Sequence, residues 1–138
     1  MNDIALELMF NKPAEKARAK SEALTLGSLV GTWVNVNAAT RDIVKIVLAN
    51  SGGSLNVHAF GACSPTPCDW GQVRGQAYAA SVAGGAAVAF TANYAFGFKS
   101  TILSGHLNGA NLVVDDFNIF NDSSGRSPYF TEGTFRRA

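Results

Sequence analysis

Hydrophobic and polar residues alternate in short runs along most of the chain, from Leu29 to the C-terminus. Alternation with a period of two is typical of a β-strand with one buried face. Clusters of Gly, Asn and Ser separate the runs and indicate turns. The pattern predicts eight strands within the segments LVGTWVNVN, RDIVKIVLA, SLNVHAFG, QVRGQAYAAS, AAVAFTANYAF, FKSTILSGHL, LVVDDFNIF and YFTEGTFRR.

The first 26 residues follow a different pattern, rich in Ala, Glu, Lys and Leu, which favours helix. Pro13 has no backbone N–H to donate and should break this helix. We therefore expect two short helices, the second over about residues 14–24. An apolar face on the first helix should dock on the domain or on a partner chain, and it consists of Ile4, Leu8 and Met9.

Eight consecutive strands joined by tight turns such as Asn108-Gly109 predict an all-β fold. The expected architecture is an eight-stranded antiparallel up-and-down barrel preceded by one or two short N-terminal helices. The expected organisation is a helical extension over residues 1–26 and a barrel domain over residues 27–138. The interior of such a barrel is either filled by side chains or holds one small ligand.

The composition of the chain argues against some classes of function. The chain has 138 residues, which suits one domain, and a net charge of +1 with 15% charged residues, so it carries no strong field to attract nucleic acid. No run approaches the roughly 20 apolar residues of a membrane helix, and the N-terminus lacks the features of a signal peptide. We expect a cytoplasmic protein that binds neither nucleic acid nor membrane.

The stretch GTWVN, Gly31 to Asn35, places a Gly-x-Trp near the start of the first strand. In an eight-stranded meander of this length it resembles the calycins, the lipocalin and avidin group of ligand-binding barrels. The resemblance implies a small molecule held inside the barrel, although the avidin biotin site cannot be matched to positions here. The region from Gly31 to Gly71 also resembles a set of uncharacterised bacterial proteins with Gly-Thr-Trp-x-Asn, Thr-Arg-x-Ile and Cys-x-Pro-x-x-Cys-Asp-Trp-Gly motifs.

The only two cysteines, Cys63 and Cys68, lie in the loop segment GACSPTPCDWG. Their spacing does not match a redox Cys-x-x-Cys motif. A zinc site would also need His58 and His106, the only histidines, to converge on the pair. Reduced thiols are the expectation in the cytoplasm, and a disulfide closing a short loop is the alternative. We expect neither a metal nor a cofactor.

In three of the predicted strands, the alternating pattern places polar and aromatic side chains together on one face. If this face points inward, its side chains would line a ligand pocket. If it points outward, they would form an interface or ordinary surface. Trp70, after the loop, lies at the barrel mouth either as a stacking surface or as a loop anchor. The predicted ligand-binding residues are Trp33, Asn35, His58, Phe60, Trp70, Arg74, Tyr78 and Tyr94.

Asp115 and Asp116 are consecutive in a predicted strand and must point to opposite sides. An inward carboxyl would have a raised pKa unless it is paired. We therefore expect a barrel that binds a small apolar or aromatic ligand. One alternative is a small enzyme of isomerase or cyclase type with His58, Asp115 or Asp116 as general acid or base. The other is an interaction module that forms a homo-oligomer through the N-terminal helices.

Overall fold

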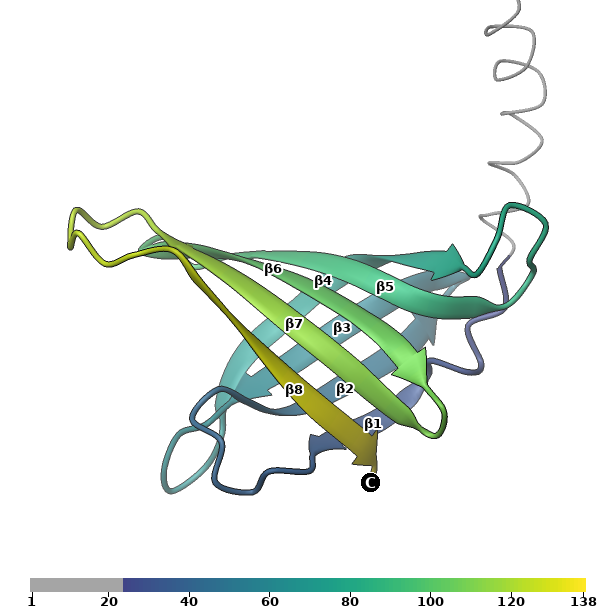
Figure 1. Ribbon diagram of the computed structural model, residues 1–138, viewed down its shortest axis with the longest axis horizontal. Helices are drawn as coiled ribbons and strands as arrows, with labels where there is room; N and C mark the ends of the chain where they lie inside the picture. Colours follow the sequence, from purple (N-terminus) through teal and green to yellow (C-terminus); the bar gives the residue numbers. More distant parts are fainter. Residues whose placement is uncertain (1–23) are drawn as a thin grey trace, which may run out of the picture.

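The computed structural model describes residues 24–138 and shows a closed barrel with strands in the order β1 to β8 (Figure 1). Every neighbouring pair is antiparallel, and β8 returns to pair with β1. The prediction of an all-β, eight-stranded antiparallel barrel is confirmed, and this architecture is consistent with a calycin-like fold. The strands are β1 Gly31–Asn35, β2 Ile43–Ser51, β3 Ser54–Gly61, β4 Cys68–Ala79, β5 Ala87–Ala95, β6 Lys99–Asn108, β7 Asn111–Phe120 and β8 Tyr129–Arg137.

The helices predicted for the N-terminal extension fall on residues 1–23, outside the described residues. Thr25, near the end of that extension, forms an isolated parallel bridge with Ala86 just before β5. Within residues 24–138 no helix is long and apolar enough to cross a membrane.

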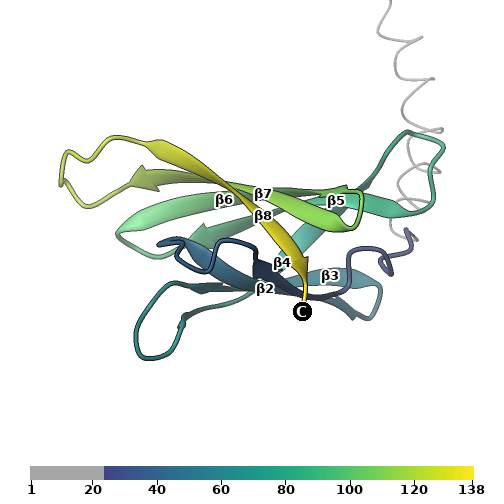
Figure 2. The same ribbon diagram turned by 60° about the horizontal axis from the view of Figure 1, so that its bottom comes forward.

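Alternate residues of the strands fill the centre of the barrel with large apolar side chains. Figure 2 shows β6 and β7 on one side of this core and β2 and β3 on the other. Burying each large side chain contributes roughly 1.5 to 3 kcal/mol, so this core is the main source of stability. The largest apolar side chains of the strands with 1% exposure or less are Trp33, Ile46, Leu48, Val57, Phe90, Leu103 and Leu112.

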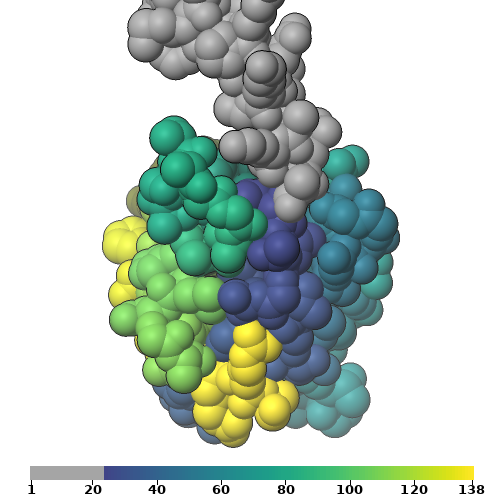
Figure 3. Space-filling view, turned by 90° about the vertical axis from the view of Figure 1, so that its right-hand side faces the viewer, coloured from purple at the N-terminus to yellow at the C-terminus, as the bar shows by residue number. Residues whose placement is uncertain are grey.

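One end of the barrel is closed by the residues that precede β1. Leu26 and Leu29 are buried in the core, and the Trp33 indole Nε1 donates a hydrogen bond to the Leu29 carbonyl at 2.8 Å. Figure 3 looks onto this end and shows the segment before β1 lying across it, between the β2–β3 region and β7.

The opposite end carries four connections, over residues 36–42, 62–67, 96–98 and 121–128. A disulfide joins Cys63, in the connection over residues 62–67, to Cys68 at the start of β4, so the expectation of reduced thiols is wrong and the alternative of a bridge holds. β1 ends early, at Asn35, so Thr131 to Gly133 of β8 have no strand partner on that side. We call this gap, between β8 and the β1–β2 loop, the seam.

Candidate functional site

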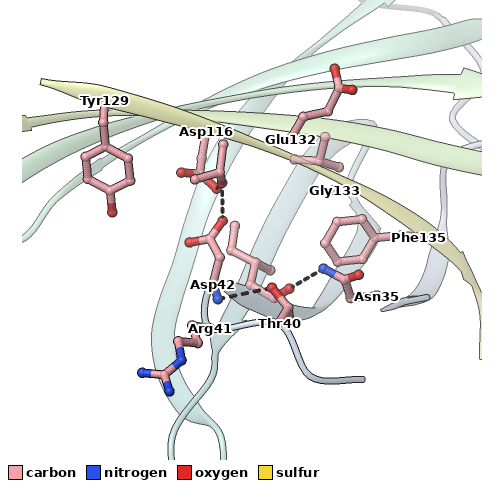
Figure 4. A pocket seen from close by; sticks show the side chains of 12 residues that line it. Asn35, Thr40, Arg41, Asp42, Asp116, Tyr129, Glu132, Gly133 and Phe135 are labelled. Carbon is pink, nitrogen blue, oxygen red and sulfur yellow. Dashed lines mark hydrogen bonds between the residues drawn. The ribbon is translucent and has the colours of Figure 1, made fainter. Parts of the chain in front are cut away.

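A cavity of about 320 Å³ opens at the seam (Figure 4). Inward-facing side chains of β7 and β8 form one wall, and the β1–β2 loop forms the other. Its lining combines carboxyl and amide groups with aliphatic and aromatic side chains. The lining residues are Asn35, Thr40, Arg41, Asp42, Ile43, Val114, Asp116, Tyr129, Thr131, Glu132, Gly133 and Phe135.

Two carboxyl groups meet across the seam through one hydroxyl. Thr131 Oγ1 lies 2.7 Å from Asp42 Oδ2 and 2.9 Å from Asp116 Oδ2. Asp42 precedes β2, Asp116 lies on β7 and Thr131 on β8, so the contact joins three parts of the chain. We refer to Asp42 and Asp116 as the carboxyl pair.

Asp116 is 2% exposed, and its pKa is raised from 3.8 to about 7, with burial as the largest cause. Asp42 accounts for a further part of this rise, because a second carboxylate nearby disfavours ionisation. The hydrogen bonds that Asp116 shares with Asn118 and Thr131 act in the opposite direction and lower its pKa. A carboxyl group that titrates near neutral pH in a cavity can both donate and accept a proton under physiological conditions.

A series of hydrogen-bonded polar side chains runs from the carboxyl pair into the barrel. Asn118 Nδ2 donates to Asp116 Oδ1 at 2.7 Å. The Asn118 amide oxygen accepts hydrogen bonds from Thr101 Oγ1 at 2.8 Å and from Lys99 Nζ at 3.1 Å. These buried polar groups are thus satisfied by one another, which fixes the orientation of Asp116.

Asn35, a predicted ligand-binding residue, lines the cavity. Both of its polar groups are already engaged, since Nδ2 donates to the Ile43 carbonyl and Oδ1 accepts from the Asn37 N–H. It therefore holds the β1–β2 loop against β2 and shapes the wall. Burial raises the pKa of Tyr129 at the rim, with smaller contributions from Asp42 and Asp116.

Three other predicted residues face the interior but do not line the cavity. Trp33 packs at the closed end. Trp70 meets Tyr94 edge to face, with ring centroids 5.5 Å apart. The Tyr94 hydroxyl accepts from the Ala59 N–H and donates to the Gly71 carbonyl, where the β3–β4 register shifts.

The remaining four predicted residues lie on the outer face of β3 and β4, away from the cavity. His58 Nε2 lies 2.5 Å from Asp69 Oδ1, and its ring stacks on Phe60. The hydrogen bond from His58 lowers the pKa of Asp69, and the Gly71 N–H lowers it further. Arg74 is exposed, and the hydroxyl of Tyr78 contacts Thr91 Oγ1. The structure thus divides the predicted set of eight between the two faces of the sheet.

Asp115 and Asp116 point to opposite sides, as expected, and Asp116 is the inward one. Asp115 instead lies opposite Glu132 on the outer face of β7 and β8. Its carboxylate raises the pKa of Glu132.

The sequence reasoning missed Asp42, Thr131 and Tyr129. Thr131 carried a usable signal, because it shares its strand face with Gly133 and Phe135, and Phe135 is an apolar residue typical of the core. No comparable sequence signal pointed to Asp42, because it lies in a loop. Within residues 24–138 no group of three His, Cys, Asp or Glu side chains could hold a metal ion.

Comparison with known proteins finds no family model, no curated protein and no solved structure that matches the chain.

Proposed function

We propose that the protein binds a small, largely apolar or aromatic molecule with a polar group, and that the site is the seam cavity. The observation that carries this proposal is the cavity lining, in which a carboxyl pair formed by the buried Asp116 and the half-buried Asp42 stands beside aliphatic and aromatic walls. Ligand pockets are mostly apolar with a few convergent polar groups. A volume of about 320 Å³ lies at the lower end of the usual range and suits a compound of one or two rings.

The packed centre of the barrel supports the same location. Large apolar side chains form one core cluster inside the barrel, so the ligand would sit at the seam rather than deep inside. This position also agrees with the calycin resemblance of GTWVN, which implies a ligand held by the barrel.

The test is a screen of small aromatic compounds against the full-length protein, followed by two matched variants. Tyr129 and Tyr78 are both 44% exposed, but only Tyr129 lines the cavity. We expect Tyr129→Ala to weaken binding of a hit at least about fivefold because ring contact is lost, and Tyr78→Ala to leave it unchanged. Equal effects of the two variants for every hit would refute the seam cavity as the site.

Acid–base catalysis at Asp116 is the second candidate, since its raised pKa and the neighbouring Asp42 suit proton transfer near pH 7. An isomerase or cyclase would use Asp116 as the acid or base. With a converted compound, Asp116→Asn should abolish turnover, while Asp115→Asn and His58→Ala should retain it. Unchanged turnover in Asp116→Asn alongside weakened binding would eliminate catalysis by this group.

A further inference from the structure

The position of the acidic proton on Asp116 follows from its neighbours. The amide oxygen of Asn118 accepts from both Lys99 and Thr101, so its NH2 group must point the other way, toward Asp116 Oδ1. Oδ1 is therefore an acceptor. The proton that Asp116 holds must lie on Oδ2, the oxygen that faces Thr131 and the cavity.

The hydrogens at the carboxyl pair can also be counted. Thr131 has one hydroxyl hydrogen, yet its oxygen makes two short contacts, to Asp42 Oδ2 and Asp116 Oδ2. Both contacts are hydrogen bonds only if one carboxyl group supplies the second hydrogen. In this arrangement the protonated carboxyl group of Asp116 donates a hydrogen bond to the Thr131 hydroxyl, which in turn donates to the carboxylate of Asp42. The carboxyl pair then holds one proton and carries one negative charge.

No cation among residues 24–138 pairs with this charge. Arg41, on the loop, points its guanidinium group away from the pair in Figure 4. The Lys99 ammonium on β6 binds Asn118 and lies 5.3 Å from the centre of the Trp70 ring. From β8, Tyr129 borders the cavity and Glu132 points its carboxylate away from the pair in Figure 4, and neither supplies a positive charge.

The cavity walls also suit an organic cation. The rings of Tyr129 and Phe135 border the same space as the carboxyl pair, and aromatic faces attract cations in addition to providing apolar contact. Ile43 and Val114 extend the apolar wall.

We propose that the ligand of the seam cavity is an organic cation, an amine or amidinium group on an aromatic or aliphatic body, whose nitrogen binds the carboxyl pair in place of the shared proton. This inference rests on the proposed function and names its ligand class. The N–H groups of the cation donate to Oδ2 of Asp42 and of Asp116. The proton of Asp116 leaves to solvent, so one cation enters, one proton departs and no covalent bond changes.

The test compares benzylamine with benzyl alcohol, which has a similar shape but no charge, on the full-length protein by titration calorimetry. The Asp116 proton must leave, so benzylamine affinity should rise about tenfold per pH unit up to pH ~7 and then level off. Repeating the titration near pH 6 in buffers with different heats of ionisation should show about one proton released. Benzyl alcohol should bind at least about tenfold more weakly near pH 8.

Two variants complete the experiment. Asp116→Asn keeps the shape of the protonated acid and should abolish both proton release and the pH dependence. Asp122→Asn removes an exposed carboxylate that pairs with Arg126 on the β7–β8 connection, and should change neither.

Equal binding of benzylamine and benzyl alcohol, pH-independent benzylamine affinity, or no benzylamine binding would each overturn the cation inference. The proposed function would survive any of these results, because it fails only if the compound screen yields no ligand that depends on Tyr129.

Discussion

Arg137 lies over the indole ring of Trp33, with its guanidinium carbon 4.3 Å from the ring centroid. The same guanidinium donates hydrogen bonds to the carbonyls of Ser28 and Val30, each at 2.7 Å. The last strand thereby holds the segment that closes the barrel end. Gly31 leaves room for this contact, because a Cβ built there would lie 2.5 Å from Arg137 Nη1.

Replacing Arg137 with alanine should lower the free energy of unfolding by about 1 to 3 kcal/mol, since two charge-assisted hydrogen bonds and the contact with Trp33 are lost. Urea unfolding followed by tryptophan fluorescence measures the change. Arg136→Ala is the control, because this side chain bonds only the Arg137 carbonyl within residues 24–138. A loss from Arg137→Ala no larger than that from Arg136→Ala would show that the contact with Trp33 is incidental.

Gly105→Ala should destabilise the barrel by about 1 to 3 kcal/mol, because the new methyl group would overlap the ring of Phe90, which is 1% exposed. Thermal unfolding is a suitable measurement. Gly27→Ala is the matched control, since a Cβ built at Gly27 meets nothing within 4 Å. A melting temperature for Gly105→Ala equal to that of wild type would mean that β5 and β6 can separate without cost.

Tyr94→Phe should cost about 1 to 3 kcal/mol of unfolding free energy, because the Ala59 N–H and the Gly71 carbonyl lose their shared partner in a buried position. Tyr78→Phe removes a hydroxyl that contacts Thr91 on the outer face and should change stability by less than about 0.5 kcal/mol. The two variants are compared in the same urea titration. Similar small losses of unfolding free energy in both variants would indicate that water replaces the Tyr94 hydroxyl.

The sequence predicted the eight strands because alternation and turn residues are local properties of each segment. Alternation does not state which face is inward, so Trp33 and His58 were grouped together although the structure places them on opposite faces. In β3 the inward positions hold the apolar residues Leu55, Val57 and Ala59. Apolar content was therefore the better indicator of the inner face.

The site itself was less predictable than the strands. Asp116 was a candidate because it lies beside Asp115 in a strand, but its partners come from distant parts of the chain. Asp42 and Thr131 are 89 residues apart, and they meet only because β1 ends at Asn35 and leaves the seam open. Closure of the barrel is a tertiary event, and no local pattern encodes where it leaves a gap.

The pH dependence of stability tests the environment of Asp116 without any ligand. In the unfolded chain this carboxyl group ionises near pH 3.8, whereas the folded protein holds the proton up to about pH 7. Between these values the folded state binds more protons, so the free energy of unfolding falls as the pH rises, by up to ~1.4 kcal/mol per pH unit. This contribution is complete below pH ~4 and is lost by pH ~7.

The measurement is urea unfolding of wild type and Asp116→Asn at several pH values from about 4 to 8. The difference between the two proteins isolates Asp116, because Glu132, whose pKa is also raised, contributes equally to both. We expect the wild type to lose stability relative to Asp116→Asn as the pH rises. The difference in stability between wild type and Asp122→Asn should instead stay constant from about pH 4 to 8 and shrink only in stronger acid, because hydrogen bonds from Ser124 and Arg126 lower the pKa of Asp122 to about 2. Parallel curves for wild type and Asp116→Asn between pH 4 and 7 would mean that Asp116 is ionised at neutral pH, and the shared proton would then be absent.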